Sequence, residues 1–198
     1  MVRQKKYEDF AYVLDVFPAS ELKAQSPGII VHRDENVIQL LGEDFFTLLE
    51  AATPKGNKPA IGARLYIGKD VPRSILRILR RIGYEDLTVN ARMNLENVIL
   101  KILEENERRF VDFFNTARPL TPRMHSLELI PGIGKKIAMK IIEEREIKPF
   151  ESYEDLRKRG GVLDPVKALQ QRILEELRNP EEKYRLFVRP PVSRESGE

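Results

Sequence analysis

The chain has no cysteine and no tryptophan, and only two histidines among 198 residues. Without cysteine it cannot form disulfides, thiolate zinc sites or a cysteine nucleophile. No run approaches the roughly 20 apolar residues that a membrane-spanning helix needs. Residues 1–9 also lack the apolar core of a signal peptide. These absences predict a cytoplasmic protein with no membrane partner.

The two histidines, His32 and His125, are far apart in the sequence, and neither has partners at the spacing of metal ligands. A single histidine beside an apolar segment usually packs or caps a helix. We therefore expect no metal site and no histidine acid–base chemistry. The sequence also predicts no cofactor.

Charge is abundant but nearly balanced. Charged residues make up 33% and apolar residues 41% of the chain, and the net charge is +3. This composition favours a packed protein over a disordered one. The positive charge is concentrated, because residues 118–142 hold five Lys or Arg against Glu128 alone. A focused basic region is typical of a surface that binds phosphates.

Residues 1–70 are rich in β-branched and aromatic residues and are interrupted by Pro, Gly and Asp. The pattern predicts strands over 10–17, 29–32, 36–42 and 63–68, with 44–52 as either a strand or a helix. Several short strands in this length indicate a small β-barrel of the oligonucleotide-binding (OB) or S1 type. An SH3-like barrel fits the same pattern.

After residue 70 the apolar period becomes helical. We expect a helix from Pro72 to Ile82 and a longer one capped by Asn94, so that residues 71–117 form bracing helices. Residues 118–178 form a separate helical domain, and residues 179–198 form a charged, proline-containing tail. Within that tail, residues 184–188 could add a strand to a neighbouring sheet. The predicted fold class is α+β.

The most informative segment is residues 129–138, which contain Pro131-Gly132-Ile133-Gly134-Lys135-Lys136. The pattern predicts a short helix over 124–129, a tight turn, and a new helix from Lys135 to about Arg145. The two glycines allow positive φ and a close approach to a phosphate. Helix N–H groups and two ammonium groups would then meet at one point, which is a phosphate site.

Two other glycine-rich sites do not fit. A Walker motif requires Gly-Lys-Ser/Thr, whereas Lys136 and Ile137 follow Lys135. The dinucleotide fingerprint requires a third glycine where Ile137 stands. Glycosylase catalysis would use Lys136 as nucleophile and Glu154 as the acid, but Glu154 lies in a connecting segment and the preceding region is β-rich. We therefore expect no enzyme activity.

The segment resembles a helix–hairpin–helix motif, a module that grips the sugar–phosphate backbone without reading sequence. The resemblance implies that Ile133 packs inward and that hairpin carbonyls of Ile130–Ile133 could hold a monovalent cation. The residues that it assigns to nucleic-acid binding are Pro131, Gly132, Ile133, Gly134, Lys135, Lys136 and Lys140.

The following residues, 149–156, resemble the connector of tandem helix–hairpin–helix domains, with Ser152 as an N-cap. A second hairpin is expected about 30 residues after the first, at Gly161–Ala168. It departs from the pattern because Asp164 and Pro165 replace the second glycine and its successor. An acidic side chain and a missing backbone donor predict a structural role for this copy.

Four further residues are secondary candidates. Arg123 and His125, just before the hairpin, could contact phosphate or brace the helix, and Tyr12 and Tyr66 could stack on bases. The barrel, the hairpin and residues 107–129 together resemble an archaeal family of uncharacterised proteins suggested to bind RNA or nucleotides. That resemblance favours RNA over DNA.

The sequence thus predicts a non-catalytic nucleic-acid-binding protein in which the hairpin holds the backbone and the barrel engages a single-stranded or structured segment. One alternative is an adaptor that binds ribosomal or transcription-associated proteins. A nuclease or glycosylase is a third possibility.

Overall fold

The structure is a computed structural model that describes residues 7–22 and 29–190. The chain forms two compact units. The first comprises Met1–Val98 with Leu177–Glu198, and the second comprises Ile99–Glu176. The predicted boundaries at residues 70 and 118 fall inside these units. The end of the predicted tail, residues 191–198, lies outside the described residues.

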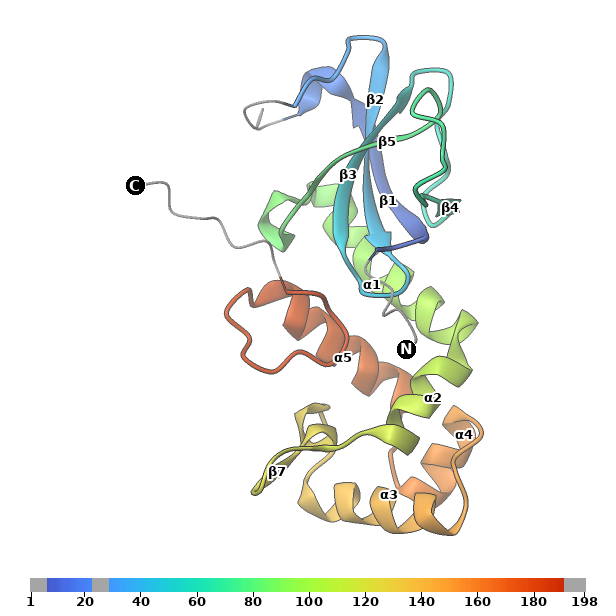
Figure 1. Cartoon of the computed structure of the whole chain (residues 1–198), viewed down its shortest axis with the longest axis vertical. Coiled ribbons are helices and arrows are strands. Elements are labelled where there is room, and N and C mark those ends of the chain that lie inside the picture. Colours follow the sequence, from blue (N-terminus) through green and yellow to red (C-terminus); the bar gives the residue numbers. More distant parts are fainter. Residues whose placement is uncertain (1–6, 23–28, 191–198) are drawn as a thin grey trace. The chain divides into compact units, whose positions relative to one another are not determined.

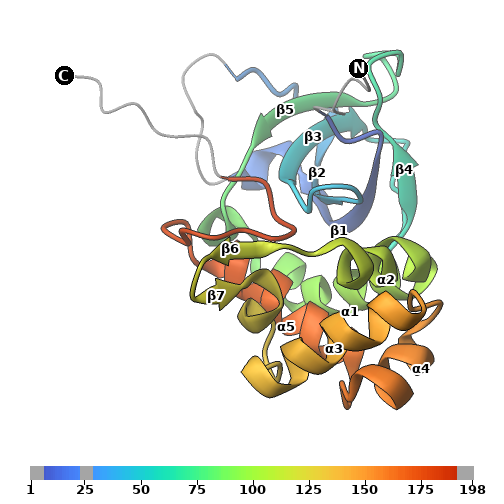
Figure 2. The ribbon, with the colours of Figure 1, turned by 60° about the horizontal axis from the view of Figure 1, so that its bottom comes forward.

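The first unit is built on a five-stranded antiparallel sheet (Figure 1). The strands are β1 (Phe10–Pro18), β2 (Glu35–Gly42), β3 (Leu48–Pro54), β4 (Arg64–Tyr66) and β5 (Arg77–Arg81). Their order in the sheet is β4-β1-β2-β3-β5. Figure 2 shows that the sheet curves strongly. Within the described residues no ladder joins β4 to β5, so the two edges of the sheet stay separate. The predicted α+β class is confirmed.

One face of the sheet forms the main core of this unit. Because side chains alternate along a strand, Ala11 and Val13 share a face with Ile38 and Leu40 of β2 and Leu49 and Ala51 of β3. Val13 lies opposite Leu40, and Leu40 lies opposite Leu49. The strand register therefore fixes which side chains share this face.

The opposite face of the strands is buried as well, because the start of α1 (Val89–Glu105) is bonded to it. The Asn94 side-chain amide donates to the Leu14 carbonyl (3.0 Å), and the Thr88 hydroxyl donates to Asp15 (2.6 Å). Gln39 donates to the Asp86 carbonyl and accepts from the Thr88 N–H. These polar contacts satisfy groups that are removed from water and so align the helix on the strands.

Three sequence-based expectations in this region are wrong. Residues 29–32 are not a strand. The helix expected from Pro72 to Ile82 is a single turn followed by β5, in which Ile78 pairs with Ala51 and Arg80 pairs with Glu50. The edge of β3 would otherwise leave backbone groups unpaired, and this outweighs the helical spacing of the apolar residues. Residues 44–52, left open by the sequence, contain the turn after β2 and the first five residues of β3.

The third wrong expectation concerns the long helix. It begins at Val89 rather than Asn94, because Thr88 Oγ1 accepts from the Ala91 N–H (3.0 Å) and acts as the cap. It also divides at Asn106 into α1 and α2 (Glu107–Thr116). Asn94 lies inside α1 and bonds to the sheet instead.

The second unit is helical. After α2 come β6 (Pro119–Thr121) and β7 (Met124–His125), a 3-10 helix (Ser126–Leu129), α3 (Lys135–Ile147), α4 (Tyr153–Asp155), a π-helical segment (Leu156–Gly160) and α5 (Pro165–Arg178). The helix expected over 124–129 is thus a strand and a 3-10 helix. The helix expected from Lys135 is confirmed. Residues 184–188 form no strand.

None of the helices in the described part of the chain is long and apolar enough to cross a membrane.

The turn between β2 and β3 is held by one carboxylate. Glu8 is 7% exposed and accepts from the N–H groups of Asp44 (2.8 Å), Phe45 (3.1 Å) and Thr47 (3.1 Å). Gly42 lies under this side chain, since a Cβ at position 42 would come within 2.2 Å of it. Phe46 in the turn has φ of 49°, a conformation that non-glycine residues adopt at a cost. The carboxylate offsets that cost.

We expect Glu8→Ala to lower the free energy of unfolding by about 2–4 kcal/mol, because several buried N–H groups lose a charged acceptor. Urea denaturation measures the change. Glu21→Ala is the control, since Glu21 is exposed and its loss should stay within about 0.5 kcal/mol. A loss below about 1 kcal/mol for Glu8→Ala would show that the carboxylate does not hold the turn.

Candidate functional site

A tight turn precedes α3 in the second unit. The Ile133 N–H donates to the Ile130 carbonyl (3.0 Å), and Gly132 has φ of +83°. Such a φ favours glycine, which explains that residue at this position. Ile133 is 3% exposed and so packs inward, as predicted. Gly132 and Gly134 both face open space, because a Cβ at either position would meet no atom within 4 Å.

The N-terminus of α3 carries charge that opposes helix stability. Lys135, Lys136 and Lys140 are exposed, and the first turn of α3 contains no acidic residue. Cations beside the positive end of a helix dipole are unfavourable by typically 0.3–1 kcal/mol each. Gly134 is the N-cap and supplies no side-chain hydrogen bond to the helix. The helix start therefore presents backbone donors and ammonium groups together.

The second turn, at residues 161–164, has a similar backbone, but the helix after it begins at an acidic cap instead of at lysines. Gly161 has φ of +75°, like Gly132, and Val162 is 4% exposed, like Ile133. The helix that follows, α5, begins at Pro165, and the Asp164 carboxylate accepts from the Lys167 N–H (3.0 Å). Asp164 is thus an N-cap and Pro165 the first helical residue. The sequence departure at 164–165 is explained by helix capping.

The two turns are connected by packing. Gly160 is buried against α3, since a Cβ there would lie 3.3 Å from Ile141. The Lys140 ammonium would lie 3.6 Å from a Cβ on Gly161, so this side chain crosses the second turn. Lys140 therefore belongs to a surface that contains both turns.

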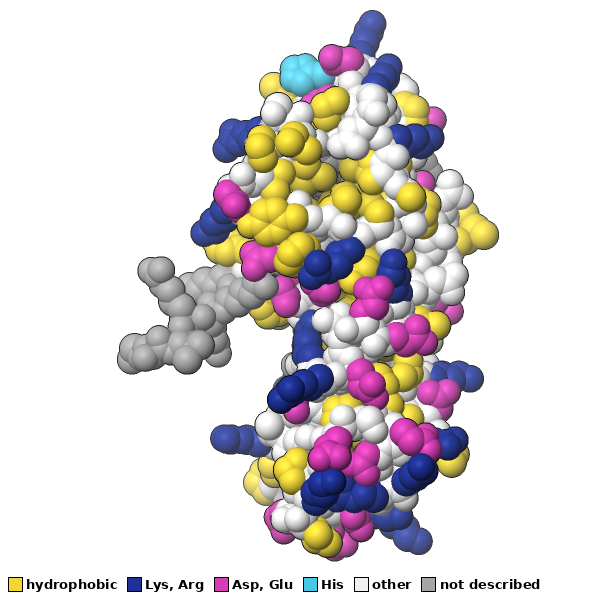
Figure 3. Space-filling model, turned by 90° about the vertical axis from the view of Figure 1, so that its right-hand side faces the viewer, with side chains coloured by type: hydrophobic (Ala, Val, Ile, Leu, Met, Phe, Trp, Pro, Cys, Tyr) yellow, Lys and Arg dark blue, Asp and Glu magenta, His cyan; other side chains and the backbone are white. Residues whose placement is uncertain are grey.

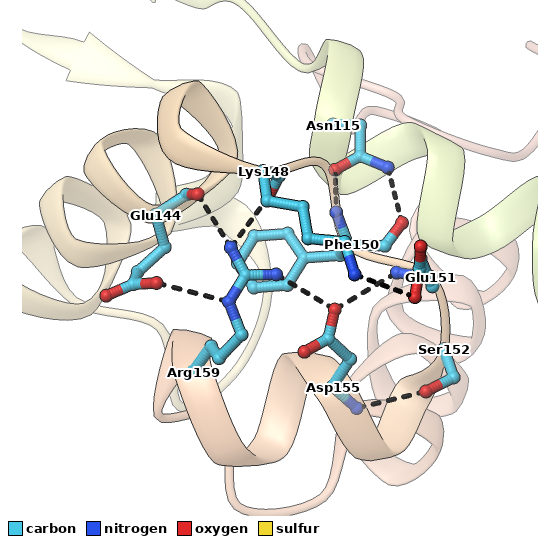
Figure 4. Close-up of polar contacts among 8 residues, drawn as sticks. All are labelled: Asn115, Glu144, Lys148, Phe150, Glu151, Ser152, Asp155 and Arg159. Atoms are coloured by element: carbon cyan, nitrogen blue, oxygen red, sulfur yellow. Dashed lines mark hydrogen bonds and ion pairs between the residues drawn. The ribbon is translucent and has the colours of Figure 1, made fainter.

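Arg159 fixes the C-terminal end of α3 (Figure 4). Its guanidinium donates to the Glu144 carbonyl (2.7 Å), the Lys148 carbonyl (2.6 Å) and the Asp155 carboxylate (2.9 Å). It also lies over the Phe150 ring at 4.7 Å from the centroid. The last carbonyls of a helix have no partner within the helix. Arg159 supplies one and so sets the direction in which the chain leaves α3.

The connector after α3 is fixed by side chains from other elements. Asn115 exchanges two hydrogen bonds with the backbone of Phe150 (2.8 and 2.9 Å). Ser152 Oγ accepts from the Asp155 N–H (3.1 Å), which confirms Ser152 as an N-cap. Arg145 donates to the carbonyls of Phe114 and Ala117 at the end of α2. No sequence signal identified Arg159, Asn115 or Arg145, because the backbone groups that they bond lie 11 to 35 residues away.

Of the two residues proposed just before the turn, His125 serves a structural role. Its Nδ1 accepts from the Leu127 N–H (3.1 Å), and the ring is 9% exposed. Burial, and then the charge of Arg145, lower the pKa of His125 below its usual value. The sequence predicted that His125 contacts phosphate or braces the helix, and this hydrogen bond supports the second role. Arg123 is exposed in the β6–β7 turn.

The two tyrosines proposed for stacking differ. Tyr12 is 0% exposed, with its hydroxyl directed at Glu43 (3.4 Å), so its ring is part of the interior and the stacking hypothesis for it is wrong. The β1 period puts it on the buried face next to α1. Tyr66 is 45% exposed, its ring packs edge-on against Phe10, and its hydroxyl donates to Asp70.

The parts of the chain that the structure describes contain no group of three or more His, Asp or Glu that could hold a metal ion. In the turn before α3, the Ile130 carbonyl already accepts one hydrogen bond. The cation expected at Ile130–Ile133 stays a prediction.

The sequence matches, over residues 7–189, a family described as "Protein of unknown function (DUF655)". It is 40% identical over 188 residues to Uncharacterized protein MJ0038 of Methanocaldococcus jannaschii, covering 94% of this chain and 82% of that protein. It is similar to the crystal structure of Af1531 from Archaeoglobus fulgidus, with a TM-score of 0.78 and 46% identity. That match covers 92% of this chain and 100% of the solved chain.

The chain therefore belongs to the DUF655 family. Both relatives come from archaea. The resemblance to an uncharacterised archaeal family is confirmed to this extent.

We expect the stability of the protein to fall as the pH drops from about 7 to 5. A histidine whose pKa is lowered by folding contributes stability above its unfolded value, about 6.5, and loses it below. Protonation of Nδ1 would also break the bond to Leu127. Urea midpoints at pH 7.5 and 5.5 measure the loss, and His125→Asn, which keeps a capping acceptor, should reduce it. An equal loss in the variant would exclude His125 as its source.

Proposed function

We propose that this protein binds nucleic acid without catalysis, RNA in preference to DNA, and that the Gly132–Lys136 turn grips the sugar–phosphate backbone. The observation that carries the proposal is the contrast between the two turns. After the first turn, the N-cap of α3 is Gly134, which has no side chain to cap the helix, and two lysines follow. After the second turn, the Asp164 carboxylate caps α5.

The features that the two turns share support a tandem helix–hairpin–helix domain in the second unit. Each half has a positive-φ glycine, a buried β-branched residue and a following helix. The second half carries one additional residue, Leu163, before its cap. Only the first half retains the chemistry for a phosphate, since Asp164 occupies the equivalent donors in the second.

The physical basis of binding is local. The first N–H groups of α3 lack partners within the helix, and the open space beside Gly132 and Gly134 allows a phosphate to approach the backbone. Lys135 and Lys136, the first two residues of α3, add charge at the same place, and Lys140 lies further along the helix. A few such contacts give affinities on the order of 10⁻⁴ to 10⁻⁶ M for sequence-independent binding. A monovalent cation at the hairpin carbonyls would add to this charge.

The proposal also includes the first unit, whose sheet fits an OB- or S1-like barrel. Its strand order places β4 and β5 at the two edges of a curved sheet, and bringing these edges together would give a partly open five-stranded barrel. An adaptor role towards ribosomal or transcription-associated proteins would use protein surfaces instead of phosphate contacts. Salt dependence separates the two, because an apolar interface responds weakly to ionic strength.

Lys135→Glu with Lys136→Glu should abolish nucleic-acid binding and leave folding intact, because both side chains are exposed. The neutral pair Lys135→Gln with Lys136→Gln should lower the log–log salt slope by about two. Fluorescence anisotropy with a labelled RNA from 50 to 200 mM salt measures both.

The matched control is Arg157→Gln with Lys158→Gln, two adjacent exposed cations in the same unit that pair with Glu154. These changes should leave binding and slope nearly unchanged. If binding survives charge reversal at Lys135 and Lys136, the hairpin is not the site.

Gly134→Asp gives α3 the same kind of N-cap residue, an aspartate, that α5 has in Asp164. Gly134 has φ of −87° and open space at its Cβ, so aspartate fits. We expect stability to stay level or rise by a few tenths of a kcal/mol. Binding should weaken about tenfold or more, because the carboxylate takes the donors that a phosphate would use. Thermal melting and anisotropy measure the two effects.

Gly134→Ala is the control, since it adds the Cβ without the carboxylate and should retain most of the binding. Equal binding by the aspartate and alanine variants would contradict a phosphate at the start of α3.

A further inference from the structure

The first unit contains a groove of about 850 Å³ between its two sheet edges. It is lined by Tyr66 and Ile67 at the β4 edge, by Leu49 and Leu76 at its floor, and by four residues of β5: Arg77, Ile78, Leu79 and Arg81. Figure 3 shows the side of this unit toward which the β4–β5 loop lies in Figure 1, and apolar side chains gather there with Lys and Arg beside them. Exposed apolar residues at the groove include Tyr7, Ile30 and Ile78.

This groove is distinct from the outer face of strands β2 and β3, on which OB-folds bind oligonucleotides. In this protein that face is occupied by the chain itself. Gln39 and Glu50, 1% and 2% exposed, point to residues 80–88 and are bonded there. A ligand of the first unit therefore has the groove between β4 and β5 available instead.

Basic side chains outnumber acidic side chains along the groove. Five Lys or Arg and three Asp or Glu line it. Glu8 binds the turn amides and Asp70 accepts from Tyr66, while Arg77 pairs with Glu35 at 3.0 Å. Lys69 lies over the Tyr7 ring, 4.6 Å from its centroid. The arrangement complements an anionic ligand with apolar or aromatic parts.

Two guanidinium groups stand together at one wall. Arg81 donates to the Pro190 carbonyl (2.7 Å), and Arg189 lies over the Phe45 ring at 4.5 Å. Burial, and then the charge of Arg189, lower the pKa of Arg81 below its usual value. Two like charges held at one wall are relieved when an anion lies between them. Arginine pairs suit phosphate because each presents a planar fork of donors.

The opposite rim carries exposed aromatic rings. Tyr7 is 58% exposed and Tyr66 is 45% exposed. Tyr66 is held in place by its edge-on contact with Phe10 and by its bond to Asp70, and Gly68 leaves room for its hydroxyl, which a Cβ would meet at 2.2 Å. A basic groove with fixed aromatic rings is the usual platform for single-stranded nucleic acid.

We propose that this groove binds a single-stranded stretch of RNA, with bases against Tyr7 and Tyr66 and a phosphate between Arg81 and Arg189. This rests on the proposed nucleic-acid function and adds a second, single-strand-specific surface to the backbone grip of the Gly132–Lys136 turn. The paired strands of a duplex keep their bases stacked on one another, so a duplex cannot use the tyrosines.

The test measures binding of the full chain to a fluorescein-labelled decauridylate and to a labelled 12-base-pair RNA duplex at 50 mM salt. Tyr7→Ala with Tyr66→Ala should weaken decauridylate binding about tenfold or more and leave duplex binding unchanged. Tyr7→Phe keeps the Tyr7 ring and leaves the bond between Tyr66 and Asp70 in place, so this variant should bind like the parent chain. Thermal melting establishes that each variant is folded.

The second pair of changes addresses the phosphate. Arg81→Gln with Arg189→Gln should weaken decauridylate binding and lower its salt slope by about 1.4, at 0.7 per charge for single strands. Lys55→Gln with Lys58→Gln is the control, because both lysines are exposed outside the groove. It should leave binding and slope unchanged.

Three results would overturn the groove assignment: no decauridylate binding, unchanged binding after the tyrosine and arginine changes, or equal binding of a labelled decaglutamate peptide. The last would mean that charge alone is recognised. Failure of the hairpin proposal has a different signature. In that case Lys135→Gln with Lys136→Gln leaves both probes bound as before, while the groove variants still lose decauridylate.

Discussion

The need to satisfy backbone groups at helix ends governs the second unit. Arg145 takes the last carbonyls of α2, Arg159 takes those of α3, Ser152 caps α4 and Asp164 caps α5. Each partner comes from a neighbouring element or turn, so satisfying the ends also fixes where the elements lie. The start of α3 contrasts with these ends, because glycine and lysine stand where a capping acid would stabilise the helix. That local cost is what a phosphate ligand would remove.

The first unit follows the same physical logic with side chains in the interior. Glu8 binds the β2–β3 turn, and Gln39, Glu50 and Thr88 join the strands to the start of α1. Buried polar groups with partners specify a unique arrangement, because any shift leaves one of them unpaired. The residues that make these bonds also cover the outer strand face, whereas the groove between the edge strands is open to a ligand.

The two proposed surfaces are chemically different. The turn before α3 offers backbone donors and flexible ammonium groups, which recognise phosphates on any strand. The groove offers tyrosine rings and paired guanidinium groups, which require unstacked bases. A protein with both would hold RNA at junctions between paired and unpaired segments. Family membership, with relatives in Methanocaldococcus jannaschii and Archaeoglobus fulgidus, is compatible with either surface.

The sequence by itself determined the local features: strands β1 and β2 to within one residue at an end, the turn at Gly132, the inward Ile133, the Ser152 cap and the start of α3. These depend on residues a few positions apart. Only the tertiary structure decided that residues 77–81 form a strand, that Tyr12 is buried, and that Arg81 bonds to the Pro190 carbonyl, 109 positions along the chain. An edge of β3 that needs a partner, or a helix that covers a face, is created by distant parts of the chain, and no local pattern records it.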